Sequence, residues 1–93
     1  MALRFVWNPR KAVANEKKHG VGFPEATTVF DDTLSLTISD PAHSLREERY
    51  LLLGMSSRRR LLAVAHVEKG ESVRIISARR ANRRERRDYE EGN

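Results

Sequence analysis

The chain is predicted to be an α+β protein: two N-terminal helices pack on an antiparallel sheet of about four strands, and a basic helix ends the chain. Three observations predict this order. Helix-capping signals fill the first third of the sequence. Residues 34–79 alternate between polar and apolar or run apolar, with turn signals between the runs. The stretch from Arg79 to Arg87 then holds six of the fourteen arginines.

The first elements are marked by local signals at their ends. The apolar run 3–7 is a candidate edge strand. Asn8 is a good N-cap and Pro9 a good first helical residue, so a helix should start here and end at Gly20. A second, shorter helix should start around residues 24–25 and end before 31–32, and its apolar face is expected to cover a sheet.

The sheet is expected from four later segments. Leu34 to Ser39 alternates apolar and polar side chains, which is typical of a strand with one solvated face. The expected strands are residues 34–39, 49–55, 61–67 and 73–79, of which the last three form a meander. Asn82 and Glu85 have the spacing of a capping box, so the final helix should span residues 83–91.

Composition indicates one small basic domain over residues 1–93. The chain is 39% hydrophobic and 33% charged, with a net charge of +5, which is globular chemistry with a basic surface. It contains no cysteine, so disulfides and thiolate sites are excluded, and its three histidines are too scattered for a zinc motif. We expect no cofactor and no metal. Without a signal peptide or an apolar run of membrane-spanning length, a cytoplasmic protein without a membrane partner is expected.

Three blocks of residues, in this order and spacing, resemble the BrnT family of bacterial toxins. The resemblance runs from Phe5 to about Tyr89. The blocks are Phe5-x-Trp7-Asn8-x-x-Lys11-x-x-x-Asn15-x-x-Lys18-His19-Gly20-Val21-x-Phe23-x-Glu25-Ala26; Phe30-x-Asp32 followed by Glu48-Arg49-Tyr50-x-x-x-Gly54-x-Ser56; and Arg74-Ile75-Ile76-Ser77-Ala78-Arg79-x-Ala81.

The resemblance implies a toxin of a type II toxin-antitoxin system with a compact fold similar to the RelE toxins. Such toxins are ribonucleases that cut RNA and arrest growth. The partner it implies is a small antitoxin, BrnA, whose DNA-binding part represses the shared operon. DNA would therefore be contacted only indirectly, through the antitoxin.

Metal-free RNA cleavage needs a base for the 2′-OH proton, cations for the phosphorane and an acid for the departing 5′-oxygen. Arg49 and Arg79 are the first candidates for the phosphate clamp, because they stand at a predicted strand start and strand end. The structural alternative is that each pairs with a carboxylate: Arg49 with Glu47 or Glu48, and Arg79 with Glu85.

Proton transfer has several candidates. Lys18 and His19 sit at a predicted helix end, where His19 could act as acid or base, although the same dipeptide suits an ordinary helix C-terminus. Glu48 could be a base beside Arg49, or only a salt-bridge partner. Tyr50 is expected to contact either an RNA base or the core.

The remaining aromatic residues and histidines are expected to be structural. His66 lies in an apolar run and should be a satisfied core or sheet-face histidine. His43 is expected to be a loop residue without a role. Tyr89 should pack the last helix down, and Phe5 and Trp7 should belong to the core.

The arginine run supports two functional interpretations besides a simply solvated surface: an electrostatic path for RNA, or a docking surface for acidic antitoxin side chains. The residues predicted to bind RNA or the antitoxin are Tyr50, Arg80, Arg83, Arg84 and Arg87. Two other classes compete with a ribonuclease. One is a nucleic-acid-binding module without catalysis, and the other is an interaction protein with an acidic partner.

Overall fold

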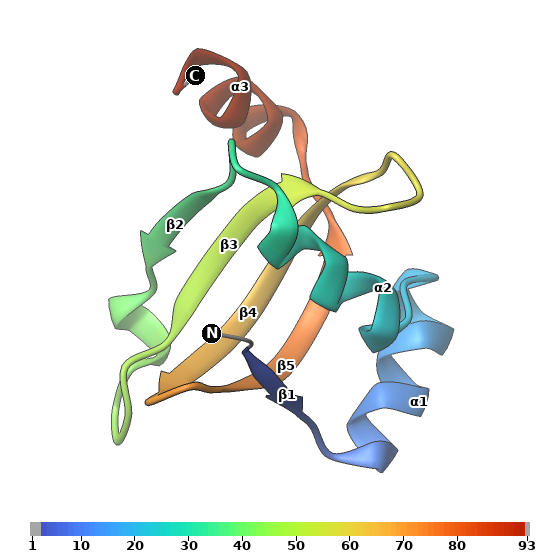
Figure 1. Ribbon diagram of the computed structural model, residues 1–93, viewed down its shortest axis with the longest axis vertical. Coiled ribbons are helices and arrows are strands. Elements are labelled where there is room, and N and C mark those ends of the chain that lie inside the picture. The colour runs from blue at the N-terminus through green and yellow to red at the C-terminus, as the bar shows by residue number, and fades with distance from the viewer. Residues whose placement is uncertain (1–2, 93) are drawn as a thin grey trace.

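A five-stranded mixed sheet forms the centre of the protein in the computed structural model, which describes residues 3–92 (Figure 1). The strand order is β1-β5-β4-β3-β2. The strands are β1 (Arg4–Val6), β2 (Leu36–Ser39), β3 (Tyr50–Met55), β4 (Leu61–Lys69) and β5 (Ser72–Arg80). The helices are α1 (Pro9–His19), α2 (Phe23–Thr28) and α3 (Arg83–Glu91), with the short 3-10 helices η1 (Val29–Asp31) and η2 (Pro41–His43). Residues 1, 2 and 93 of the domain expected at 1–93 lie outside the described residues.

The prediction of about four antiparallel strands with helices first was wrong about β1. This strand precedes the helices, adds a fifth member to the sheet and runs parallel to β5, with Arg4 opposite Ser72 and Val6 opposite Arg74. Parallel neighbours need a long crossover connection, and here all other strands lie between the two along the chain. β1 has only three residues, and so short a segment contains no pattern that predicts pairing with a strand so far along the chain. The apolar run 3–7 did indicate an edge strand.

The two longer helices begin and end where their capping residues indicate. The Asn8 side chain accepts hydrogen bonds from two backbone N–H groups of the first turn of α1, and Gly20 ends this helix at a φ of 69°. Asn82 and Glu85 form the expected capping box of α3. No helix within residues 3–92 is long and apolar enough to cross a membrane.

One face of the sheet is covered by the segment from the end of α1 to η1, as Figure 1 shows. The core comprises Val21, Phe23, Ala26 and Val29 of this segment and Leu52, Leu62, Val64, Val73, Ile75 and Ala78 of the sheet. Phe5 and Trp7 pack against this core as expected. Gly54 allows the close approach of η1, because a Cβ at this position would lie 2.6 Å from Cγ1 of Val29.

A buried amide joins α1 to the sheet. The Asn15 side-chain amide donates to the carbonyl oxygens of Ala78 (2.8 Å) and Val21 (3.0 Å), and its Oδ1 accepts from the Ala78 N–H at 3.1 Å. β1 pairs with β5 only as far as Arg74, so Asn15 supplies the hydrogen bonds that a longer β1 would have made at Ala78.

A candidate nucleic-acid interface on the open face of the sheet

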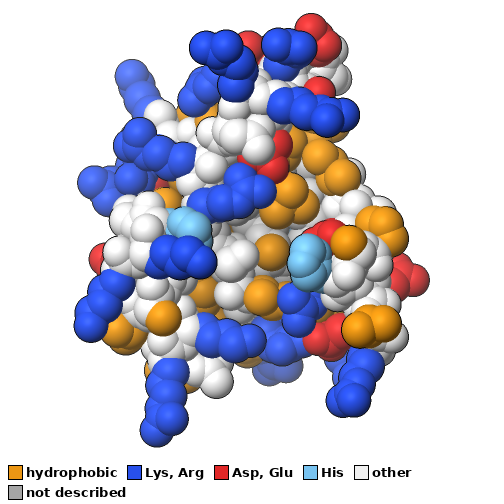
Figure 2. All heavy atoms as spheres, turned by 180° about the vertical axis from the view of Figure 1, so that it is seen from behind, with side chains coloured by type: hydrophobic (Ala, Val, Ile, Leu, Met, Phe, Trp, Pro, Cys, Tyr) orange, Lys and Arg blue, Asp and Glu red, His pale blue; other side chains and the backbone are white. Residues whose placement is uncertain are grey.

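The sheet face opposite the core carries a groove of about 470 Å³. Figure 2 shows this face, with apolar surface near its centre and Lys and Arg side chains around it. The register places Leu51 beside Ala65, and Ala65 beside Ser77, so these side chains form one row across the sheet. The lining residues are Ile38, Ser39, Asp40, His43, Arg49, Leu51, Ala65, Ile76, Ser77 and Arg79.

Arg49 reaches this groove without a carboxylate partner among residues 3–92. Its Nε atom is buried and has no hydrogen-bond partner within that part of the chain. The alternative pairings are not seen, because Glu47 forms an ion pair with Arg74 and Glu48 accepts a hydrogen bond from Tyr50. Arg49 is therefore a cation positioned on the groove with hydrogen-bonding capacity to spare.

Arg79 also lines the groove, but it carries the carboxylate pairing that the sequence left open. Its Nη1 and Nη2 atoms donate to Oε1 and Oε2 of Glu85 at 2.7 and 2.9 Å. These hydrogen bonds lower the pKa of Glu85 and raise that of Arg79. Because Glu85 also caps α3, the Arg79 guanidinium is held in a fixed orientation and is partly neutralised.

Arg49 and Arg79 line opposite ends of the groove. β3 and β5 both run antiparallel to β4, so the start of β3 and the end of β5 lie at opposite ends of the sheet. Arg79 pairs with Ala63 of β4, and Ala63 pairs with Leu53 of β3. Leu53 lies four residues after Arg49, so the backbone positions of Arg49 and Arg79 are separated by roughly 13 Å along the strand direction. The sequence led us to expect that both guanidiniums would clamp one phosphate. This register fits better with each guanidinium contacting a different phosphate.

His43 is a groove residue that the sequence left without a role. It ends η2, and its Nδ1 atom lies 3.1 and 3.0 Å from Oδ1 and Oδ2 of Asp40. The sequence signal for this pair is the spacing Asp40-x-x-His43 around Pro41, because one turn of 3-10 helix brings residues that are three positions apart close together.

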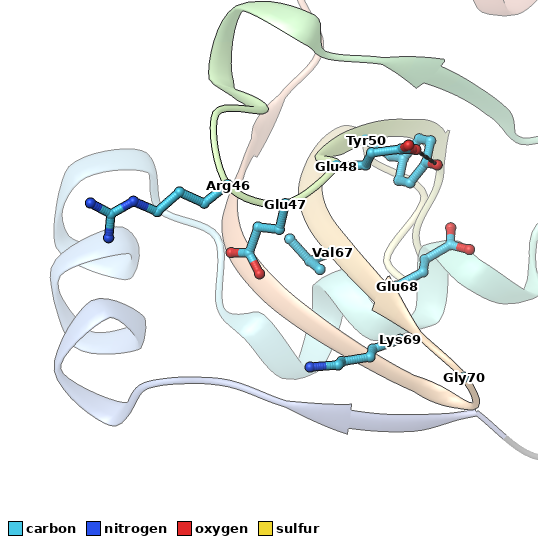
Figure 3. A pocket seen from close by; sticks show the side chains of 8 residues that line it. All are labelled: Arg46, Glu47, Glu48, Tyr50, Val67, Glu68, Lys69 and Gly70. Atoms are coloured by element: carbon cyan, nitrogen blue, oxygen red, sulfur yellow. Dashed lines mark hydrogen bonds between the residues drawn. The ribbon is translucent and has the colours of Figure 1, made fainter.

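Glu48 and Tyr50 belong to another hollow, of about 660 Å³, at the end of the sheet near the β4–β5 turn (Figure 3). Tyr50 Oη donates to Oε2 of Glu48 at 2.6 Å, which raises the pKa of Tyr50. Tyr50 pairs with His66, whose ring also contacts Phe30 of the core-side segment. The structure therefore does not bring Glu48 and Tyr50 into the groove with Arg49.

His66 is a satisfied core histidine, as expected. Its side chain is fully buried, with Nε2 lying 2.9 Å from Oε2 of Glu68 and Nδ1 lying 3.3 Å from the Val64 carbonyl oxygen. Lys18 and His19 form the last turn of α1, the structural position that competed with a catalytic role. Neither is among the residues that line the groove.

The other candidate arginines lie at the end of the sheet where α3 begins. Arg83, Arg84 and Arg87 are exposed on α3, while Arg80 lines a separate hollow of about 220 Å³ together with Arg59 and Arg86. Four of the first five residues of α3 are arginines and its last turn carries no basic residue. This order opposes the helix dipole at about 0.3–1 kcal/mol per charge, so helix stability does not explain it.

A partly buried ion pair between Glu25 and Arg60 stabilises the turn between β3 and β4, and sequence reasoning missed it. Glu25 accepts a 2.9 Å hydrogen bond from Arg60 Nε and a 2.7 Å hydrogen bond from Ser56 Oγ. The Arg60 interaction lowers the pKa of Glu25. The resemblance motif contained Glu25 and Ser56 but did not indicate that they meet.

Asp32 joins three segments of the protein. Its Oδ2 accepts from Met55 N (2.8 Å) and Tyr89 Oη (2.6 Å), and its Oδ1 accepts from Leu34 N (3.0 Å). Burial alone would raise the pKa of Asp32, but these hydrogen bonds outweigh it and the pKa is lowered. The same contact raises the pKa of Tyr89 to about 12. Tyr89 thus holds α3 against the rest of the fold, as expected.

Comparisons with known proteins agree with the resemblance. A family model described as "Ribonuclease toxin, BrnT, of type II toxin-antitoxin system" matches residues 7–85. The crystal structure of the Brucella abortus ribonuclease toxin BrnT is similar to this chain with a TM-score of 0.68 and 20% sequence identity, over 88% of this chain and 100% of that one. At this identity the likeness shows a shared fold. A search of curated proteins found no significant match.

Proposed function

Because this chain belongs to the BrnT family of ribonuclease toxins of type II toxin-antitoxin systems, we propose that it cuts RNA in the groove on the open sheet face. Cleavage proceeds without a metal ion, by attack of a 2′-hydroxyl on the adjacent phosphate. The observation that carries this proposal is Arg49, a groove-lining cation that pairs with no carboxylate within residues 3–92, because Glu47 and Glu48 are engaged elsewhere. A phosphate oxygen is the acceptor that such a guanidinium fits best.

Arg49 and Arg79 have different roles in this proposal. Arg49 holds the scissile phosphate and stabilises the charge that develops on its oxygens during attack. Arg79, at the other end of the groove and already bound to Glu85, contacts a neighbouring phosphate of the same strand. The apolar row at Leu51 and Ala65 gives a floor on which a nucleotide can rest between the two guanidiniums.

The test is cleavage of a single-stranded RNA by purified protein in EDTA. Products ending in a 2′,3′-cyclic phosphate are expected, together with no cleavage where the target nucleotide is 2′-deoxy, since that substrate lacks the nucleophile. Arg49→Ala should lower kcat about 100-fold, whereas Arg79→Ala should chiefly raise KM, by about 10-fold. Arg10→Ala removes the same charge from the exposed first turn of α1 and should leave cleavage unchanged.

Three results would overturn the proposal. Intact RNA after long incubation with the wild-type protein, combined with salt-sensitive binding, would favour a non-catalytic nucleic-acid-binding module. Cleavage abolished by EDTA and restored by a divalent cation would contradict metal independence. Full activity of Arg49→Ala would remove the groove as the site.

The partner we propose is a BrnA-like antitoxin that docks its acidic side chains on the arginines of α3 and so blocks the approach to the groove. The reversed charge order of α3 supports a surface selected for binding. Replacing Arg83, Arg84 and Arg87 by glutamate should weaken binding of the small protein encoded beside the toxin gene, and the wild-type complex should weaken with salt. Unchanged binding by the triple variant would contradict this docking surface. The same variant with normal RNA cleavage would assign these arginines to the antitoxin rather than to RNA.

A further inference from the structure

The His43–Asp40 pair has the geometry of a catalytic dyad. An ionised carboxylate only accepts hydrogen bonds, so the contacts of 3.0 and 3.1 Å from Asp40 require a proton on Nδ1 of His43. In the neutral ring this leaves the lone pair on Nε2, which has no hydrogen-bond or ion-pair partner within residues 3–92. The carboxylate thus selects the tautomer in which Nε2 can take a proton.

This pair and Arg49 belong to one hydrogen-bonded unit. The Asp40 N–H donates to the Arg49 carbonyl oxygen at 2.9 Å. Ser44 Oγ bridges the same two residues, because it donates to the Asp40 carbonyl oxygen at 2.6 Å and accepts from the Arg49 N–H at 3.0 Å. The segment that holds the imidazole is therefore tied to the residue that holds the guanidinium, and both side chains line the groove.

We propose that His43 is the general base of the RNA cleavage, with Asp40 as the residue that positions its ring. This inference rests on the proposed function and extends it to a residue outside the sequence-predicted set. Proximity supports the role, since the dyad lies at the Arg49 end of the groove, where the scissile phosphate is held.

The proposed cleavage step needs no cofactor, because every proton has a donor and an acceptor among His43, the RNA and water. Nε2 of His43 takes the proton of the 2′-OH while the 2′-oxygen forms a bond to phosphorus. The bond between phosphorus and the 5′-oxygen then breaks, and the leaving oxygen takes a proton from a water molecule in the open groove. The imidazolium, stabilised by Asp40, returns its proton to the resulting hydroxide. The products are a 2′,3′-cyclic phosphate and a 5′-hydroxyl.

The test compares His43→Asn and His43→Ala with the wild-type protein. The asparagine variant keeps an N–H donor for Asp40, and so preserves η2, but has no base. Both variants should cut about 100-fold more slowly, and added imidazole should restore part of the activity of His43→Ala. Leu45→Ala is the matched control, because it changes a side chain of the same loop that is 96% exposed and does not line the groove.

A 5′-phosphorothiolate substrate separates a base from an acid, because its sulfur leaves without protonation. His43→Ala should remain slow on this substrate, whereas recovery to the wild-type rate would assign His43 as the acid and overturn the proposal. Asp40→Asn should slow RNA cleavage when His43 is present but should have no further effect in the His43→Ala variant. If the two substitutions lower the cleavage rate additively, Asp40 does not act by positioning His43.

The result also distinguishes the two proposals. A wild-type protein that cuts RNA, together with both His43 variants cutting equally well, would overturn the dyad and leave the ribonuclease assignment intact. A wild-type protein that does not cut RNA would overturn both.

Discussion

Replacing Asn15 with alanine should lower the free energy of unfolding by about 3 kcal/mol, because one side chain satisfies three backbone groups. Two of these groups belong to Ala78 of β5 and one to Val21, which follows α1. Asn15 is only 7% exposed, so water cannot readily replace it.

The magnitude follows from the three hydrogen bonds. Each buried bond contributes about 1 kcal/mol, and a backbone group left without a partner costs about 1–3 kcal/mol. The loss is therefore about 3–4 kcal/mol, from which the better helix propensity of alanine recovers roughly 0.5 kcal/mol. For a domain of this size, that is a large fraction of a total stability of 5–15 kcal/mol.

Urea unfolding followed by circular dichroism measures the change, with an unchanged m value required for a clean comparison. Amide exchange at Ala78 should accelerate in the variant, since its N–H donates to Asn15 Oδ1. Lys11→Ala, an exposed change on the same helix, should stay within about 0.5 kcal/mol of wild type. A loss below 1 kcal/mol for Asn15→Ala, with Ala78 still protected, would refute the reasoning.

Three further predictions concern packing and titration. Gly54→Ala should destabilise the protein by about 2 kcal/mol or more in thermal unfolding, because the new Cβ would lie 2.6 Å from Val29; a melting temperature equal to wild type would contradict the close packing of η1. The lowered pKa of Asp32 means that its contribution is present above the ordinary value of 3.8 and is lost as pH falls through the lower folded value. Asp32→Asn should therefore unfold with a shallower pH dependence below 3.8, and equal slopes would exclude this carboxylate as a source. Tyr89→Phe should cost about 1 kcal/mol by removing the hydrogen bond to Asp32, measured by urea unfolding, with no loss expected if α3 is held by apolar packing alone.

The parts of the fold that were predicted correctly are those with local causes. α3 was placed at residues 83–91 because its capping box lies within four consecutive residues, and α1 because Asn8 and Gly20 mark its ends. The parallel pairing of β1 is non-local, since it depends on a strand almost seventy residues away. The role of Asn15 is also non-local. A polar residue within a predicted helix does not indicate that its side chain makes the hydrogen bonds at Ala78 that a neighbouring strand would have made.

The groove was predictable only in part, for a related reason. Strand ends suggested Arg49 and Arg79 as rigid cations, and both do line the groove. Sequence adjacency suggested that Glu48 would act beside Arg49, but neighbouring positions at a strand start point to different surfaces, and Glu48 turns to Tyr50. His43 was set aside as a loop residue because a loop has no periodicity from which a face can be inferred.

The capping box of α3 has a consequence for how substitutions in the C-terminal helix are interpreted. Asn82 and Glu85 hold the first turn of α3, and the same Glu85 carboxylate holds the Arg79 guanidinium. Removing the Asn82 side chain, which is not among the groove-lining residues, would loosen Glu85 and with it the orientation of Arg79. If substitutions in α3 or its truncation abolish toxicity, the cause can be loss of the surface arginines or displacement of Arg79 in the groove. Only variants that keep Asn82 and Glu85 distinguish these two causes.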